Sequence, residues 1–305
     1  MIQVQGELVR LAKAELQDAY QDGYDAMIPK LQHPLLGYST RTLKFMNEQL
    51  AAYSSLAPST LTGEGESYSE DTVEEQGFIQ ITPEKYTRSV LVTEEAIRYS
   101  DRWEMVKNRT AMLGRAALQN IEEKAIDILA QGFSTTYRTG VDGLALFSDT
   151  HTLTGGGSND NLLGALPLNS ENFELAKIRL ERQTDNLGNP LAPTTNMLLV
   201  VGPEYREVAQ LLTMSPGIYD SANLAVNVNR GVNFTVNNYL SVAEGKYWFL
   251  IDLDRAKDMF FMNSGWQPRF TQEDIPQKGL FANYVAAQYS FNFTGHQWVV
   301  GSNFS

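Results

Sequence analysis

Three residue types found in hydrolase triads occur within four positions of this chain, as Ser148, Asp149 and His151. A triad needs a histidine held between a nucleophile and a carboxylate that reach it from separate segments. Side chains this close along the backbone cannot surround one imidazole in that way, so the pattern favours a turn. We predict no catalytic residues and no enzyme activity, and a soluble hydrolase that uses Asp149 and His151 remains the weaker alternative.

The residues near His151 also lack the spacing of a metal site. The chain has no cysteine, and its histidines are His33, His151 and His296. Neither Asp149 nor Asp160 completes a ligand set around His151. The glycine run at 155–157 is not followed by the Lys-Ser/Thr pair of a phosphate-binding loop. We therefore predict no metal and no cofactor.

Composition and charge narrow the class of partner. Hydrophobic residues make up 43% of the 305 residues, which is typical of a folded globular protein. The 36 acidic and 24 basic residues leave a net charge of −12, so the chain should repel a phosphate backbone. No apolar run approaches the roughly 18 residues that cross a bilayer, and no signal-peptide pattern opens the chain. We expect synthesis in a cytoplasm, no membrane association and no sequence-specific DNA binding.

Acidic residues concentrate in one segment that has no basic residue, between Lys44 and Lys85. The cluster that we single out comprises Glu64, Glu66, Glu70, Asp71, Glu74 and Glu75. A run of solvated charges can serve solubility alone. The helix predicted after it carries Arg102, Lys107 and Arg109, however, so an arm from one copy could meet complementary charge on a neighbour. We predict that these nine residues make contacts between subunits.

The elements that would position these residues follow from periodicity. Residues 3–30 read as an amphipathic helix, and the polar segment 58–92 reads as a long hairpin whose return limb alternates like a strand. Thr93 is predicted to cap the next helix. From Trp103 to Gln131 apolar residues recur every three or four positions, which predicts a spine helix about 40 Å long.

The second half of the chain alternates helices and strands. Ser170 is predicted to cap a helix with Phe173, Ala176 and Leu180 on its buried face. A strand and a helix that ends near Met214 follow, and the remainder is rich in strands. The predicted strands are Met197–Val201, Val232–Leu240, Tyr247–Ile251, Met259–Met262 and a long final run, Tyr284–Val300. The whole pattern predicts the α+β class.

The order of these parts resembles the major capsid proteins of tailed bacteriophages with the Hong Kong 97 type fold, and especially their Mu-like head-protein relatives. The resemblance covers most of the chain. It rests on the arm, the hairpin, the spine helix, the segment Val-Asp-Gly-Leu-Ala-Leu-Phe at 141–147 followed by His151, the segment Leu-Gly-Asn-Pro-Leu at 187–191, and Met-Leu-Leu-Val-Val at 197–201 before Pro203-Glu204.

This resemblance implies a division of the chain into five parts. They are an N-terminal arm (1–57), an extended hairpin loop (58–92), a peripheral domain with the spine helix (93–161), an axial domain (162–242) and a return to the peripheral domain (243–305). It also implies self-assembly into pentamers and hexamers of an icosahedral head around double-stranded DNA, made in the bacterial host cytoplasm, with a portal as partner. Some relatives cross-link a hairpin lysine to a neighbour, but residues 45–84 contain no lysine, so noncovalent contacts are expected.

Two further expectations concern assembly. Because the chain reaches the hairpin within about 60 residues of Met1, we expect a separate scaffolding protein instead of a scaffolding segment that is cleaved off. The alternatives within the same class are an encapsulin-like shell of a cellular nanocompartment and a decoration or tail component of a virion.

Overall fold

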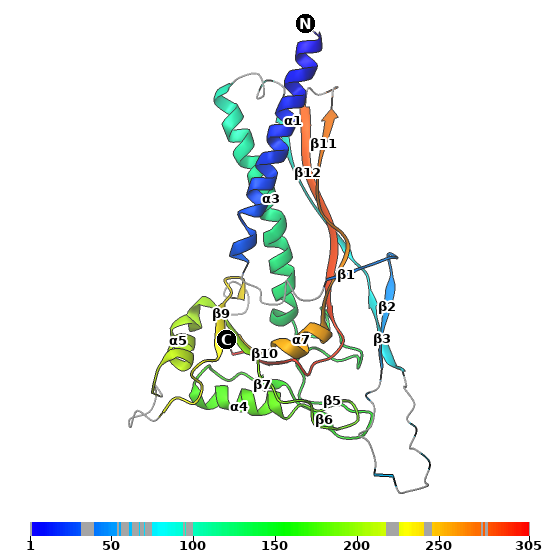
Figure 1. Ribbon diagram of the computed structural model, residues 1–305, viewed down its shortest axis with the longest axis vertical. Coiled ribbons are helices and arrows are strands. Elements are labelled where there is room, and N and C mark those ends of the chain that lie inside the picture. Colours follow the sequence, from blue (N-terminus) through cyan, green and yellow to red (C-terminus); the bar gives the residue numbers. More distant parts are fainter. Residues whose placement is uncertain are drawn as a thin grey trace.

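The structure is a computed structural model that describes residues 2–31, 40–53, 55, 61–62, 67, 70, 75–93, 95, 100–217, 226–240, 246–275, 277 and 280–304. Two long helices and a long sheet form one elongated part, which stands on a broader part built from a second sheet and shorter helices (Figure 1). No described helix is both long enough and apolar enough to cross a membrane.

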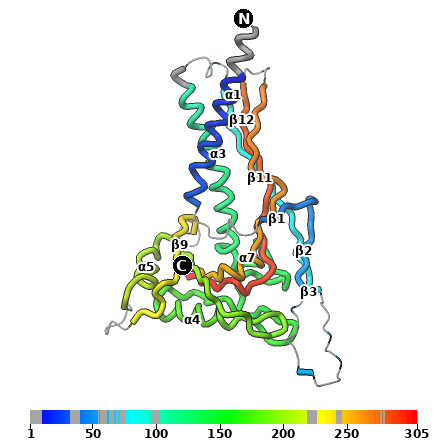
Figure 2. The backbone as a smooth tube through the Cα atoms, viewed as in Figure 1, coloured from blue at the N-terminus to red at the C-terminus, as the bar shows by residue number. Residues whose placement is uncertain are grey.

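The two long helices, α1 (Ile2–Asp25) and α3 (Ser100–Ala130), lie side by side along the elongated part (Figure 2). Gly114 allows this close approach, because a Cβ atom there would lie 2.4 Å from the carbonyl oxygen of Tyr20. The predicted spine helix is confirmed, with its apolar stripe buried. Thr93 does not cap it, however, because Thr93 is the last residue of strand β4 and α3 begins at Ser100.

The long sheet has the strand order β1-β11-β12-β4. Its strands are β1 (Thr40–Thr42), β4 (Glu84–Thr93), β11 (Phe260–Ile275) and β12 (Leu280–Phe293). The three longer strands pair antiparallel, and β1 pairs parallel to β11. The predicted final run 284–300 is wrong as one strand, because the chain turns after Phe293 and begins β13 in another sheet.

A separate two-stranded hairpin, β2 (Glu48–Tyr53) and β3 (Glu75–Ile81), projects beside the broad part (Figure 1). Its outgoing strand therefore begins about ten residues before the predicted boundary at residue 58. The predicted return limb is two strands with different partners, because β3 pairs with β2 while β4 joins the long sheet.

The second sheet has the order β7-β13-β10-β8-β9, and its central strands β13, β10 and β8 are buried on both faces. Its strands are β7 (Leu162–Gly164), β8 (Met197–Val201), β9 (Asn233–Val236), β10 (Trp248–Asp252) and β13 (Val299–Ser302). In β10, Trp248 and Leu250 pack with the core under α4 (Ser170–Glu181) and α5 (Arg206–Met214). Alternate residues, Phe249 and Ile251, pack with the core that contains the end of α3. Burial on both faces explains why these strands read as continuous apolar runs.

This sheet does not follow the predicted domain boundary at residue 243. Strands β10 and β13 belong to the segment assigned to the peripheral domain, yet they pair with β7 and β8 of the segment assigned to the axial domain. The cap predicted for α4 is also displaced by one residue, because Asn169 accepts the hydrogen bond from the backbone N–H of Asn172. The remaining short elements are η1 (Ile28–Lys30), β5 (His151–Thr152), β6 (Ser158–Asn159), η2 (Pro203–Tyr205) and α7 (Leu253–Met259).

Candidate functional site

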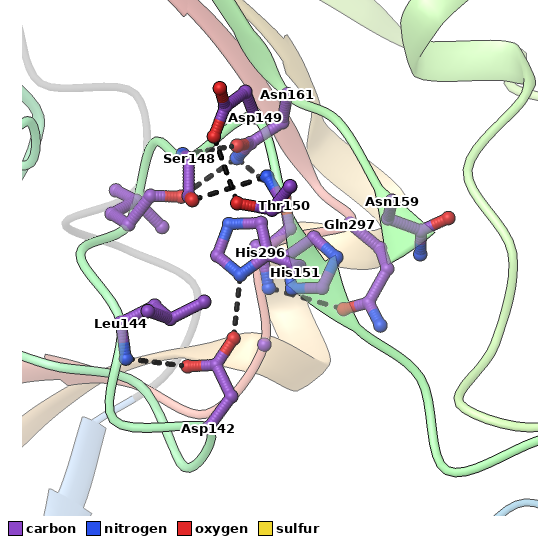
Figure 3. Close-up of polar contacts among 12 residues, drawn as sticks. Asp142, Leu144, Ser148, Asp149, Thr150, His151, Asn159, Asn161, His296 and Gln297 are labelled. Carbon is purple, nitrogen blue, oxygen red and sulfur yellow. Dashed lines mark hydrogen bonds and ion pairs between the residues drawn. The ribbon is translucent and has the colours of Figure 1, made fainter. Parts of the chain in front are cut away.

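A cluster of three ionisable side chains lies where three segments of the chain meet. Asp142 comes from a turn after α3, His151 opens strand β5, and His296 lies in the turn between β12 and β13. The Nδ1 atom of His151 lies 2.6 Å from Oδ2 of Asp142. The two imidazole rings are stacked, with centroids 3.6 Å apart and planes inclined by 3° (Figure 3).

Local backbone geometry aims the Asp142 carboxylate at His151. The turn closes through hydrogen bonds from Gly143 N–H to the Gly140 carbonyl and from Gly140 N–H to the Leu144 carbonyl. Gly143 adopts a positive φ of 75°, which glycine tolerates without a steric penalty. The other Asp142 oxygen, Oδ1, accepts a hydrogen bond from the Leu144 N–H at 3.1 Å. One carboxylate oxygen thus anchors the turn and the other faces the histidine.

Burial controls the protonation of this cluster. His151 is 1% exposed and His296 is 8% exposed. Burial and, to a smaller extent, the neighbouring His151 lower the pKa of His296 to about 3 although Asp142 opposes the shift, so His296 is neutral at physiological pH. Burial alone would raise the pKa of Asp142, but the hydrogen bonds from His151 and Leu144 bring it below its ordinary value. The Nε2 atoms of both histidines are buried and have no hydrogen-bond partner among the described residues.

The three residues that suggested a hydrolase do not form a triad. The hydroxyl of Ser148 accepts a hydrogen bond from the Thr150 N–H, and Asp149 accepts one from the Thr150 hydroxyl. Within the described part of the chain, neither side chain is hydrogen-bonded to His151. The glycine run at 155–157 lies in the turn that joins β5 to β6. Asp160 is engaged elsewhere, in an ion pair with Arg179 at 2.7 Å.

Sequence reasoning missed the cluster because it considered only carboxylates beside or after His151. Asp142 lies nine residues before His151, and His296 lies 145 residues after it (296 − 151). The turn signal Thr-Gly-Val-Asp-Gly at 139–143 was visible in the sequence, but nothing in the sequence pairs it with the β12–β13 turn.

The predicted contact residues fall at two distant places. Glu70 and Glu75 are exposed on the hairpin side, whereas Glu64, Glu66, Asp71 and Glu74 lie outside the described residues. The basic residues Arg102, Lys107 and Arg109 belong to the first part of α3. In Figure 1 that end of α3 lies near the top of the molecule, whereas the β2–β3 hairpin lies well below it, beside the lower half. No ion pair among the described residues joins Glu70 or Glu75 to Lys107 or Arg109, and Lys107 instead contacts Glu104 at 2.9 Å.

Large apolar side chains are exposed on the projecting elements. On the hairpin and its approach, Phe45, Tyr53 and Phe78 are 72%, 65% and 53% exposed. A second group lies around the end of α5 and the segment before β9, comprising Leu211, Met214, Val226 and Val228. Where such groups form a contiguous patch, they are typical of a surface that binds another molecule.

Comparison with solved structures shows the same fold in viral and virus-like shells. The mature capsid of bacteriophage PhiM1 is similar at 10% identity, with 88% of this chain and 86% of that chain covered and a TM-score of 0.59. The virus-like particle from Pyrococcus furiosus is similar at 11% identity, with 95% and 98% covered and a TM-score of 0.56. The procapsid of bacteriophage JBD30 is similar at 15% identity, with 97% and 75% covered and a TM-score of 0.53.

Family membership follows from the sequence itself. No curated protein matches the chain. Residues 78–286 match the phage capsid protein family, a segment that runs from the hairpin strand β3 through α3 and both sheets into β12. This is more than half of the chain, and the Hong Kong 97 type fold agrees with it. The chain belongs to the phage capsid protein family and is a structural protein of a capsid shell.

Proposed function

We propose that this chain is the major capsid protein of a tailed bacteriophage, and that it assembles into the pentamers and hexamers of an icosahedral head that encloses double-stranded DNA. The observation that carries this proposal is the β2–β3 hairpin. Ile79 and Ile81 of this hairpin are buried, but Tyr53 and Phe78 are exposed. These exposed side chains favour a further partner surface, and a neighbouring copy supplies one in a closed assembly of identical subunits.

Charge supports the same arrangement. Strand β3, which begins at Glu75, lies well away from the basic start of α3 (Figure 1), so complementary pairing between them requires two copies. The surface pair between Lys107 and Glu104 does not prevent this, because an exposed ion pair contributes little and can be exchanged. We propose the division into axial and peripheral domains together with this assembly. The exposed residues around Met214 and Val228 would then form the contact between axial domains of neighbouring subunits.

The cargo and further partners follow from the shell. A net charge of −12 keeps enclosed DNA from adhering to the wall, so DNA is held without sequence-specific binding. Filling a closed shell requires an opening, for which a portal is the proposed partner. A separate scaffolding protein would hold subunits at the correct curvature during assembly. The protein is then made in the bacterial host cytoplasm and ends in the virion.

A charge exchange tests the pairing. Replacing Glu70, Asp71, Glu74 and Glu75 by lysine should reduce the yield of shells while the unfolding temperature of the subunit stays unchanged, because acidic side chains are almost never buried in a core without a partner. Adding R102E, K107E and R109E to that variant should restore shells seen by negative-stain microscopy, because the attraction is re-formed with opposite signs. A normal shell yield from the first variant, or no recovery in the second, would count against these contacts.

A cellular nanocompartment is the second candidate. It is favoured by the similarity to the Pyrococcus furiosus virus-like particle, which covers nearly all of both chains. The contents of purified shells from the native source distinguish the two, because DNA inside supports a phage head and a protein cargo supports the nanocompartment.

A further inference from the structure

We propose that Asp142, His151 and His296 form a binding site for one divalent transition-metal ion of the zinc type. Each side chain offers one ligand atom, and these atoms all lie within 4.8 Å of one another. Two imidazole nitrogens and one carboxylate oxygen form a ligand set that suits Zn²⁺, Co²⁺ or Ni²⁺, whereas Mg²⁺ and Ca²⁺ prefer oxygen ligands alone. The site lies within one subunit, so it goes beyond the proposed function and does not depend on assembly.

The strongest observation is the state of the two histidines. Both rings are almost fully buried, yet their Nε2 atoms have no hydrogen-bond partner among the described residues. A buried polar atom without a partner destabilises a fold, so two such atoms in stacked rings call for a ligand.

The two imidazole rings must rearrange to hold an ion. Ligand atoms about 2.1 Å from a tetrahedral zinc ion lie about 3.4 Å from each other. In the cluster Oδ2 of Asp142 lies 2.6 Å from Nδ1 of His151, and one ligand atom from each of the three residues lies within 4.8 Å of the others. Because the unpartnered atoms are Nε2 and the parallel rings do not aim their lone pairs at one point, binding requires both rings to turn about their side-chain torsions.

An ion and its water ligand can reach the site from one side. The Asp142 side chain is 23% exposed, and the cluster lines a pocket of about 290 Å³. Ala52 and Gln76, near the loop end of the paired strands β2 and β3, line the same pocket. The Gln76 side chain also donates a hydrogen bond to the Thr154 hydroxyl at 3.1 Å. A bound ion would cross-link the Asp142 turn, β5 and the β12–β13 turn at the surface that supports the hairpin.

Metal titration of the full chain without a histidine tag tests the site. After chelator treatment, Zn²⁺ should bind at one ion per subunit by calorimetry, and Co²⁺ should give visible ligand-field bands. Free Zn²⁺ at 100 times its dissociation constant should raise the unfolding temperature by about 5 °C. Mg²⁺ should produce none of these effects.

Variants assign the ligands. H151Q, H296Q and D142N should each abolish the Co²⁺ bands and the Zn²⁺-dependent rise in unfolding temperature. The matched control is H33Q, because His33 is the other histidine of the chain, and it should behave like the wild type. The proposal is overturned if the wild type gives no Co²⁺ bands, a result that does not depend on whether any variant folds. It is also overturned if the double variant H151Q/H296Q binds Zn²⁺ as tightly as the wild type.

Discussion

Replacing Gly114 by alanine should detach the N-terminal helix from the spine helix. In an isolated helix this substitution would stabilise α3 by about 0.5 to 1 kcal/mol, because alanine loses less backbone entropy than glycine. Here the new Cβ would lie 2.4 Å from the Tyr20 carbonyl oxygen and 2.7 Å from the Tyr24 nitrogen. Ordinary contacts begin at 3.4 Å, so the two backbones must separate by about 1 Å.

The separation costs more than the helix gains. Leu16 and Tyr20 of α1 are 2% and 5% exposed and pack against the spine helix and the long sheet. Complete burial of such a side chain contributes about 1.5 to 3 kcal/mol. Partial loss at both positions exceeds the gain in helix propensity, so the α1–α3 contact should weaken by about 2 to 4 kcal/mol.

Hydrogen exchange followed by mass spectrometry measures this effect locally. Peptides from α1 should exchange at least about 30-fold faster in G114A, while peptides from α4 keep their wild-type rates. G23A should give the same pattern, because a Cβ at Gly23 would lie 2.0 Å from the Ala111 carbonyl oxygen. Arg115→Ala is the matched control, since Arg115 is the next residue and is exposed. Unchanged or slower exchange of α1 in G114A would refute the steric reasoning.

Two further predictions concern buried polar groups. The Asn161 side chain donates hydrogen bonds to the carbonyls of Leu146 (2.7 Å) and Val299 (3.2 Å) and accepts one from the Ser148 N–H (3.0 Å). N161A should therefore lower the free energy of unfolding, measured by urea titration, by about 3 kcal/mol. A loss below about 1 kcal/mol would contradict this account. Burial raises the pKa of Tyr20 to about 12, above the value near 10 in the unfolded chain. The contribution of Tyr20 to the free energy of unfolding is therefore complete below pH 10 and is lost as the pH rises towards 12. Between pH 10 and 12 the wild type should therefore lose about 2 kcal/mol more than Y20F, and equal losses would show that Tyr20 is not the group responsible.

The sequence alone determined the elements whose burial pattern is local. The spine helix was predicted almost to its ends because one face of a single helix meets the core, and that face repeats every three or four residues. Strand β8, Met197–Val201, was predicted with its observed bounds because both faces of the second sheet are covered. The membership of the capsid family also followed from the order of these elements.

Only the tertiary structure decided which distant segments meet. The sequence pattern of strands β3 and β4 predicts one limb, but the two strands are separated by Thr82 and Pro83 and pair with different strands. Local sequence does not specify those partners. The run at 284–300 contains a change of sheet after Phe293 that a continuous apolar pattern does not mark. The cluster of Asp142, His151 and His296 depends on the packing of three segments, and no periodic signal in the sequence reports a contact of that kind.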